Sequence, residues 1–268
     1  MPIHHNSLRP VLVVTHHFLA VLFSAAAVNG QSNSWRIPGS EQSSPVTVQE
    51  LRHDVPKAAR AEMDKAEKAS RKRRTDEEIE HLRKAVGIDP EFIAARNNLA
   101  VSLMIRDTEF AVAQLQEAIQ IDSNRPVLFY NLALGYLMLN KLDDAESAAR
   151  TARMLGLTDL RAKLLLGWVL AAEEKYTAEA LSLVKSAREE HPLANMLTAR
   201  VLIGQNRPEE AKSYIYAYLS TGDEEYRDYA ARWLDYIANT QQQNRGKTFA
   251  QEATLSPVGS SVADDRGR

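Results

Sequence analysis

The sequence predicts an all-α solenoid, a stack of antiparallel helix hairpins closed by a C-terminal cap helix. A small residue with apolar neighbours recurs at intervals of 33 to 35 residues, at Ala85, Ala118, Ala152 and Ala187. A second small-residue marker keeps step with it at intervals of 32 to 34 residues, at Ala66, Ala100, Ala133, Gly167 and Ala199. Two marker series that share one period indicate a helical repeat array, in which each unit buries its apolar face against its neighbours.

The composition is that of a folded protein without a basic surface. The 268 residues are 44% hydrophobic and 25% charged, which is typical of globular chains. The formal net charge of −2 argues against a nucleic-acid-binding protein, which needs cations to neutralise phosphates. Because the chain has no cysteine, disulfides, thiolate metal sites and a cysteine-linked lipid anchor are excluded.

An apolar run sets residues 1–30 apart from the rest of the chain. Residues 11–28 read VLVVTHHFLAVLFSAAAV, follow Arg9 and end in small residues, which is typical of a cleaved signal peptide. The alternative is an uncleaved membrane anchor, since about 18 apolar residues are just long enough to span a bilayer. Both predict export, to a periplasmic or secreted location or to a membrane-anchored one with an extracytoplasmic body. Residues 31–54, rich in Ser, Pro, Gly and Gln, are expected to be a disordered linker.

The solenoid is expected over residues 55–239, and its first hairpin at about residues 57–90. The two helices of this hairpin are separated by the basic turn Arg71–Arg74, and Thr75 with Glu78 predicts a capping box for the second helix. The second helix is expected to stop at Asp89-Pro90, because proline cannot continue a helix. The acidic residues after the basic turn favour a self-balancing solvated turn, and the alternative is a contact with an anionic lipid or polymer.

Four more hairpins are expected at about residues 93–123, 126–157, 160–192 and 193–220. Pro126 is favoured in a first helical turn, and His191-Pro192 is expected to stop the fourth hairpin. Acidic pairs beside the inter-helix turns are expected to favour helix N-termini, at Asp143-Asp144, Glu173-Glu174 and Glu209-Glu210.

A one-sided helix is expected to close the array at residues 223–239. Tyr226, Ala230, Trp233 and Ile237 share one face of it and charged residues the other, as a terminal cap requires. Residues 240–268 lack periodicity and are expected to be a disordered tail.

At these markers the chain resembles the tetratricopeptide-repeat family. The third repeat matches most fully as YNLALGYLMLNKLDDAESAARTA, and the first matches through DEEIEHLRKAVGIDP. The fifth departs from the pattern with Tyr218, where alanine is usual. The resemblance covers about residues 58–222. It implies a right-handed superhelix whose first helices line a concave groove for peptides or partner helices, with small residues where the helices of a hairpin cross closely.

The resemblance also implies which residues line this groove. The partner-binding candidates are Asn97, Asn98, Val101, Met104, Tyr130, Asn131, Leu134, Met138, Trp168 and Arg200. The first helices of the third and fourth repeats are apolar nearly all round, which predicts burial on every side. Either a partner covers the second apolar face, or tight curvature or the chain's own linker does.

Three of these candidates are the expected anchors of a partner, since aromatic and methionine side chains suit adaptable contacts. They are Trp168, Tyr130 and Met138, and the alternative for each is packing between repeats. The asparagines are candidates to hydrogen-bond a peptide backbone, with local solvation as the alternative. The carboxylate clamp of some relatives is matched at one of five positions, Asn98, so that function is not expected.

No catalytic, metal or cofactor pattern is found. The histidines form no i, i+4 pair on a predicted helix of the solenoid, and no nucleophile elbow or phosphate-binding glycine loop occurs. The sequence therefore predicts a non-enzymatic protein–protein interaction scaffold of the periplasm or cell envelope. Its partner is expected to be a protein or peptide, with no nucleic acid and no cofactor, and with membrane contact only through an uncleaved N-terminal segment. The alternative is a membrane-tethered assembly or stability factor of an envelope complex.

Overall fold

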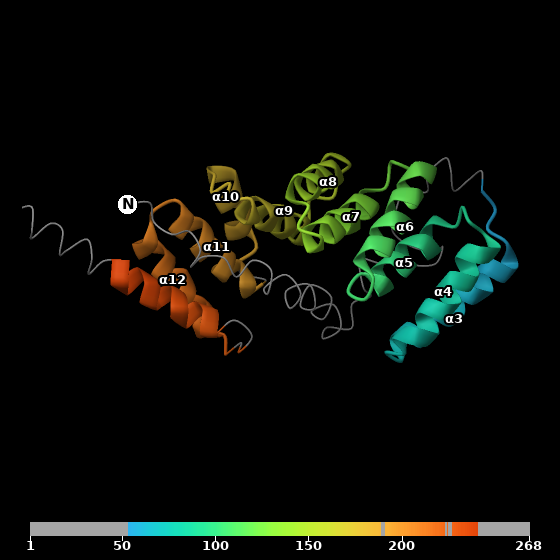
Figure 1. The fold of residues 1–268 in the computed structure, drawn as a ribbon, viewed down its shortest axis with the longest axis horizontal. Coiled ribbons are helices and arrows are strands. Elements are labelled where there is room, and N and C mark those ends of the chain that lie inside the picture. The colour runs from blue at the N-terminus through green and yellow to red at the C-terminus, as the bar shows by residue number, and fades with distance from the viewer. Residues whose placement is uncertain (1–52, 189–190, 223, 225–226, 241–268) are drawn as a thin grey trace, which may run out of the picture. The chain divides into compact units, whose positions relative to one another are not determined.

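The computed structural model of the chain describes residues 53–188, 191–222, 224 and 227–240. The predicted signal peptide, and nearly all of the predicted linker and of the predicted tail, lie outside these residues. All regular structure within them is helical (Figure 1). Among the described residues, no helix combines the length and apolar character needed to cross a bilayer.

The chain divides into two compact units, residues 1–187 and 188–268. The first unit holds four hairpins, whose helices are α3 (Lys57–Arg71) with α4 (Thr75–Ile88), α5 (Ile93–Leu103) with α6 (Thr108–Ile121), α7 (Pro126–Met138) with α8 (Leu142–Met154), and α9 (Leu160–Ala172) with α10 (Ala178–Ser186). The second unit holds α11 (Leu193–Gly204), α12 (Pro208–Leu219) and a helix over residues 227–240.

The contacts between helices follow the order of the chain. In the first unit each helix packs against its hairpin partner, and α4, α6 and α8 also pack against the first helix of the next hairpin. In the second unit α11 packs against α12. The predicted all-α stack of helix hairpins is therefore confirmed.

The small marker residues lie where helices come closest. All four residues of the first marker series and all five of the second are buried. A Cβ atom added to Gly167 in α9 would lie 2.6 Å from Cγ1 of Val184 in α10, closer than carbon atoms approach without a shift. Within a hairpin, the helix crossing at this point thus requires a residue without a side chain.

The hairpin turns reuse one backbone conformation. Arg73, Asn140, Glu174 and Asn206, each between the two helices of a hairpin, have positive φ angles of 56° to 59°. Asparagine tolerates this left-handed backbone conformation, whereas the conformation costs more free energy for an arginine or a glutamate. The same turn is therefore kept at four hairpins even where the residue type does not favour it.

Two local predictions at helix ends are wrong. Thr75 is the first residue of α4 rather than its cap, and the cap, Arg74, makes no side-chain capping bond. Glu78 is buried and accepts a hydrogen bond of 2.7 Å from the Ser102 hydroxyl in α5, so its carboxylate serves the next hairpin instead of a capping box. The second helix of the fourth hairpin, α10, ends at Ser186, ahead of the expected stop at His191-Pro192.

The other helix ends follow the sequence signals. Helix α4 ends at Ile88 before Asp89-Pro90, and α7 begins at Pro126. In the helix over residues 227–240, Ala230 and Ile237 are buried and Trp233 is half-buried, while Arg232 and Asp235 are exposed, which is the one-sided pattern predicted for a cap. Tyr226 lies outside the described residues.

Candidate partner-binding surface

The candidate residues of the first unit come mainly from α5, α7 and α9, the first helices of three successive hairpins. Helix α7 contacts α6, α8 and α9. Nine of the 13 residues of α7 and nine of the 13 residues of α9 are buried. The prediction that these helices are buried on every side is confirmed. We call the candidates on these three helices the first-helix face: Asn97, Asn98, Val101, Tyr130, Asn131, Leu134, Met138 and Trp168.

Amide side chains link the first helices of three hairpins. The Asn131 amide of α7 donates a hydrogen bond of 2.8 Å to the Asn97 carbonyl oxygen of α5. The Asn97 amide donates one of 3.2 Å to Asn98, whose amide nitrogen lies 4.0 Å from the sulfur of Met63 in α3. All three asparagines are buried. The predicted alternative of local surface solvation therefore does not describe them, because they bond one another across repeats.

Tyr130 places a polar group at the junction of α7 and α9. Burial raises the pKa of its hydroxyl well above the usual value; the charge of Arg161 lowers this pKa slightly and that of Asp159 raises it slightly. Asp159 caps α9 by accepting a hydrogen bond of 2.9 Å from the Ala162 N–H, and it also binds Nη2 of Arg161 at 2.6 Å. Tyr130 is therefore a neutral hydroxyl at any physiological pH and a candidate to orient a polar group, not to transfer a proton.

The apolar members of this face are closed off within the chain itself. Leu134, Trp168 and Met138 are 1%, 4% and 8% exposed, and Val101 is buried as well. Exposure this low means that solvent barely touches these side chains. A partner can reach them only when the chain's own covering atoms move, so binding at this face has to include a local rearrangement.

Two candidates do not join this face. Met104 follows the end of α5 and is fully buried, with its sulfur 3.4 Å from the Cβ position at Gly135 of α7. It fills the contact between the second and third hairpins. Arg200 lies on α11 in the second unit and is half-buried, and the positions of the two units relative to one another are not determined.

An ion-pair network ties α8 to the fourth hairpin. Arg150 donates to Glu146 at 2.7 Å and to both oxygens of Glu179 at 2.8 and 2.9 Å, and Lys175 binds Glu146 at 2.6 Å. Hydrogen bonds, first from Lys175 and then from Arg150, lower the pKa of Glu146 to about 2. Burial raises the pKa of neighbouring Glu173. The network joins repeats through opposite charges, and Glu146 and Glu173 also share a hydrogen bond.

The expectation for acidic pairs is confirmed in two cases and wrong in one. Asp143 and Asp144 lie in the first turn of α8, and Glu209 and Glu210 in the first turn of α12, where the helix dipole favours negative charge. Glu173 instead caps the C-terminus of α9. Lys175 lies 3.1 Å from its carboxylate and supplies the positive charge that the helix end does not.

Sequence reasoning missed a pocket between α4 and the end of α5. It is lined by Asp76, Ile79, Glu80, Arg83, Lys84, Leu103 and Arg106. The sequence pattern assigns the acidic residues to a self-balancing turn and gives no role to the cations of this pocket. The available signal was the i, i+4, i+7 spacing of Asp76, Glu80 and Arg83, which places them on one face of α4. Within the described ranges, no group of three metal-ligating side chains occurs.

Comparison with known proteins gives the fold. No protein-family model and no curated protein matches the chain. Among solved structures, the chain is similar to PilF of Pseudomonas aeruginosa, with 19% identity and a TM-score of 0.57 over 75% of this chain and 93% of that one. It is also similar to YrrB, described as a TPR protein with an unusual peptide-binding site, with 18% identity and a TM-score of 0.54 over 69% and 95% of the two chains.

A third similar structure is MamA from Desulfovibrio magneticus RS-1, with 13% identity and a TM-score of 0.56 over 62% of this chain and 96% of that one. At these identities the likeness concerns the fold and not the ligand. The stack of hairpins seen here is thus the fold of tetratricopeptide-repeat proteins.

Proposed function

We propose that this chain, a stack of helix hairpins with the tetratricopeptide-repeat fold, is a non-enzymatic scaffold that binds an apolar peptide or helix at the first-helix face. The observation that carries the proposal is the apolar character of α7 and α9 on every side. A helix in a stack needs an apolar stripe against its neighbours, and a helix that is apolar all round needs cover on its remaining side too. YrrB, which shares the fold, has a peptide-binding site.

The chain's own cover over this face is part of the proposal. Leu134, Met138 and Trp168 are nearly inaccessible in the chain, so a partner takes the place of atoms that already lie there. The exchange costs little apolar burial, because one apolar cover replaces another. Such a scaffold binds slowly, at a rate limited by local opening, and it binds partners that bring a comparable apolar surface.

The amide chain supplies the specificity of the site. Asn97, Asn98 and Asn131 already bond one another, and an extended peptide that approaches α5 and α7 offers backbone N–H and C=O groups to the same atoms. Buried polar groups favour partners that keep them hydrogen-bonded, since an unmatched one costs about 1–3 kcal/mol. We therefore expect a partner with an exposed backbone edge or polar residues opposite this chain of amides.

Photo-crosslinking tests the site without burying a charge in the core. A glutamate at Trp168 or Met138 would bury a charge and unfold the hairpin, so an aromatic replacement is the better probe. With p-benzoylphenylalanine in place of Trp168, illumination in cell-envelope extract should give a discrete crosslinked partner. The control is the same replacement at Phe110, a 38% exposed residue of α6. Crosslinks of the same kind and yield at both positions would refute the assignment.

The place of action is proposed to be outside the cytoplasm, from the apolar run at residues 11–28. The alternative role, a membrane-tethered assembly or stability factor, requires that this run stay attached. N-terminal sequencing of the protein from fractionated cells distinguishes the two. A new N-terminus after the run supports a periplasmic or secreted scaffold, an intact Met1 in the membrane pellet supports the tethered form, and an intact Met1 in the cytosol contradicts export.

A further inference from the structure

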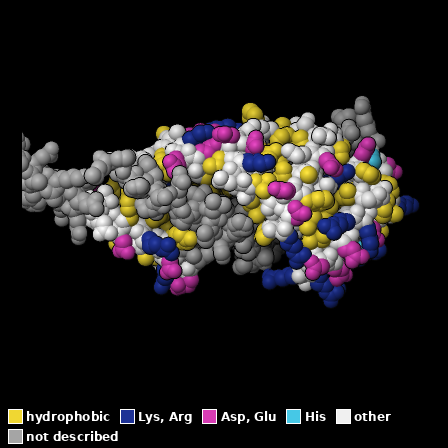
Figure 2. All heavy atoms as spheres, in the orientation of Figure 1, with side chains coloured by type: hydrophobic (Ala, Val, Ile, Leu, Met, Phe, Trp, Pro, Cys, Tyr) yellow, Lys and Arg dark blue, Asp and Glu magenta, His cyan; other side chains and the backbone are white. Residues whose placement is uncertain are grey.

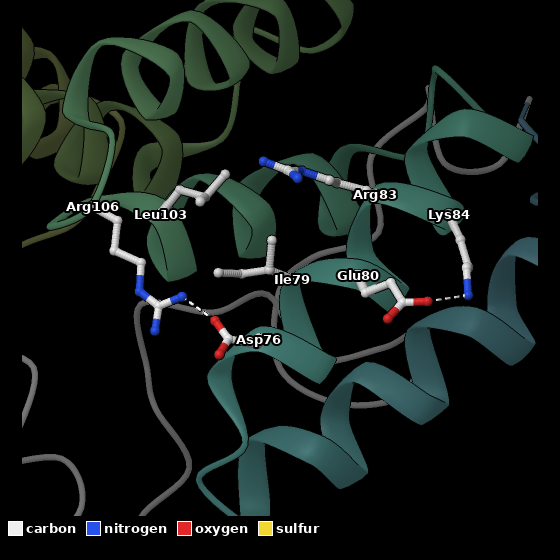
Figure 3. A pocket seen from close by; sticks show the side chains of 7 residues that line it. All are labelled: Asp76, Ile79, Glu80, Arg83, Lys84, Leu103 and Arg106. Carbon is white, nitrogen blue, oxygen red and sulfur yellow. Dashed lines mark hydrogen bonds and ion pairs between the residues drawn. The ribbon is translucent and has the colours of Figure 1, made fainter.

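A pocket of about 530 Å³ lies between α4 and the end of α5, and none of its lining residues belongs to the first-helix face. Ile79 of α4 and Leu103 of α5 are 6% and 5% exposed and form its apolar floor. Figure 3 shows Ile79 and Leu103 between the charged side chains, which extend from α4 and, for Arg106, from the turn after α5. The pocket therefore combines a small apolar base with a charged rim.

The rim of the pocket carries three cationic and two anionic side chains, so one cation has no anionic partner on the rim. Arg106 pairs with Asp76, and the Lys84 ammonium lies 2.6 Å from the Glu80 carboxylate (Figure 3). Arg83 is exposed and makes no ion pair or hydrogen bond with a described residue beyond its own helix. Its guanidinium, with several N–H donors in a planar fork, is therefore available to a carboxylate that enters the pocket.

The two ion pairs on the rim can break to admit a carboxylate ligand. In the Arg106–Asp76 pair the two side chains are 52% and 87% exposed, and in the Lys84–Glu80 pair 52% and 64%. Pairs this open to water are weak, because the solvent competes for both partners. Arg106 can thus exchange Asp76 for an incoming carboxylate, which would then lie between two guanidinium groups.

The basic turn continues this positive surface along the chain. Lys72 and Arg73 directly precede α4 and are exposed, while Arg71 and Arg74 pair with Glu67 and Glu77. Figure 2 shows Lys and Arg side chains gathered with acidic ones at this end of α3 and α4. An acidic segment that reaches the pocket past Asp76 therefore meets further cations.

We propose that the pocket binds a carboxylate side chain of an acidic peptide segment whose adjacent residue is apolar. The carboxylate pairs with Arg83 and Arg106, and the apolar neighbour rests on Ile79 and Leu103. A recess between two helices admits a side chain and excludes a flat membrane surface. Within the pocket the rim has an excess of one positive charge, which matches a single carboxylate; a polyanion would have to bind along the basic turn instead. This site is separate from the first-helix face and gives the chain a second, electrostatic contact.

Fluorescence anisotropy with a labelled peptide of alternating glutamate and leucine tests the pocket. The full chain should bind this peptide at low ionic strength, more weakly as salt is added, because the charges are exposed. A peptide with glutamine in place of glutamate should not bind. Arg83→Glu should weaken binding roughly tenfold or more, as expected for loss of a hydrogen bond to a charged group.

The matched control is Lys141→Glu, which makes the same change of charge at an exposed residue of the turn before α8. It should leave peptide affinity unchanged. An equal loss in both variants would overturn the proposal in favour of general charge attraction. Unchanged binding by Arg83→Glu, or Arg83-dependent binding to phosphatidylglycerol vesicles without peptide binding, would overturn it as well. Crosslinking at Trp168 should persist in Arg83→Glu, so failure of this site is distinguishable from failure of the scaffold proposal.

Discussion

Gly167→Ala should destabilise the fourth hairpin, although alanine is the better helix former. The added methyl carbon would lie 2.6 Å from Cγ1 of Val184, 3.3 Å from Cβ of Leu183 and 3.5 Å from the Val184 backbone nitrogen. Val184 is fully buried and branched at Cβ, so it has little freedom to rotate away. The Leu183 Cβ, which is fixed to the backbone, is also closer than an ordinary contact, so rotation of the Val184 side chain alone does not relieve the crowding. The two helices must therefore separate.

The magnitude follows from two opposing effects. Replacing a mid-helix glycine with alanine stabilises a helix by roughly 1 kcal/mol. Overpacking a closely packed contact costs about 1–3 kcal/mol, and the steric overlap at Gly167 puts it toward the upper end of that range. The free energy of unfolding should therefore fall by about 1–2 kcal/mol.

Urea denaturation followed by circular dichroism measures this change, with Gly87→Ala in α4 as the matched control. Apart from the backbone of its own helix turn, no atom lies within 4 Å of an added Cβ at Gly87, so that variant should be neutral or more stable by up to about 1 kcal/mol. Val184→Ala removes the obstructing methyl groups, so the double variant with Gly167→Ala should lose less stability than the two single changes together. A Gly167→Ala variant as stable as the parent would refute the close crossing.

Further predictions concern the polar contacts between repeats. Asn131→Ala leaves the Asn97 carbonyl oxygen without the donor of its 2.8 Å bond, and should lower the free energy of unfolding by about 1–3 kcal/mol in urea titrations; no change would mean that the amides do not hold the hairpins together. For Glu146 the pKa is lowered from 4.5 to about 2, mainly by the Lys175 hydrogen bond, so its contribution to stability is complete above pH 4.5 and lost as the pH falls toward 2. The difference in urea midpoint between the parent and Glu146→Gln should therefore shrink over that interval, and a constant difference would contradict the ion-pair network.

The hairpin stack was predictable because its signals are local and repeated. The recurrence of alanine and glycine marks helix crossings, and the Asp89-Pro90 and Pro126 signals mark helix ends that the structure reproduces. These features depend on backbone sterics and on the spacing of apolar residues, and both are written in the sequence itself.

The failures arise where a distant residue decides the outcome. Glu78 has the spacing of a capping box, but Ser102, 24 residues further along the chain, takes its carboxylate. Met104 has the spacing of a groove residue, but Gly135 of the next hairpin leaves room for its sulfur. The spacing of Asp76, Glu80 and Arg83 places them on one face of α4, but it does not show that Leu103 and Arg106 of the next hairpin complete the pocket.

The sequence predicts which residues form the candidate site, but not whether the chain itself or a partner covers them. The apolar pattern of α7 and α9 indicates burial on every side, and the structure has it. The pattern left open whether a partner or the chain itself provides the cover, and the burial of Leu134 and Trp168 within the chain favours self-cover. The hydrogen bonds among the asparagines follow from the 34-residue offset of Asn97 and Asn131, which places them at equivalent positions of adjacent repeats.

Hydrogen–deuterium exchange with the partner captured at Trp168 tests recognition by the first-helix face most directly. Exchange of the backbone amides of α5, α7 and α9 should slow when the partner binds, while that of α6 and α8 should stay the same. Slower exchange confined to the second helices, with α7 and α9 unaffected, would contradict recognition at this face.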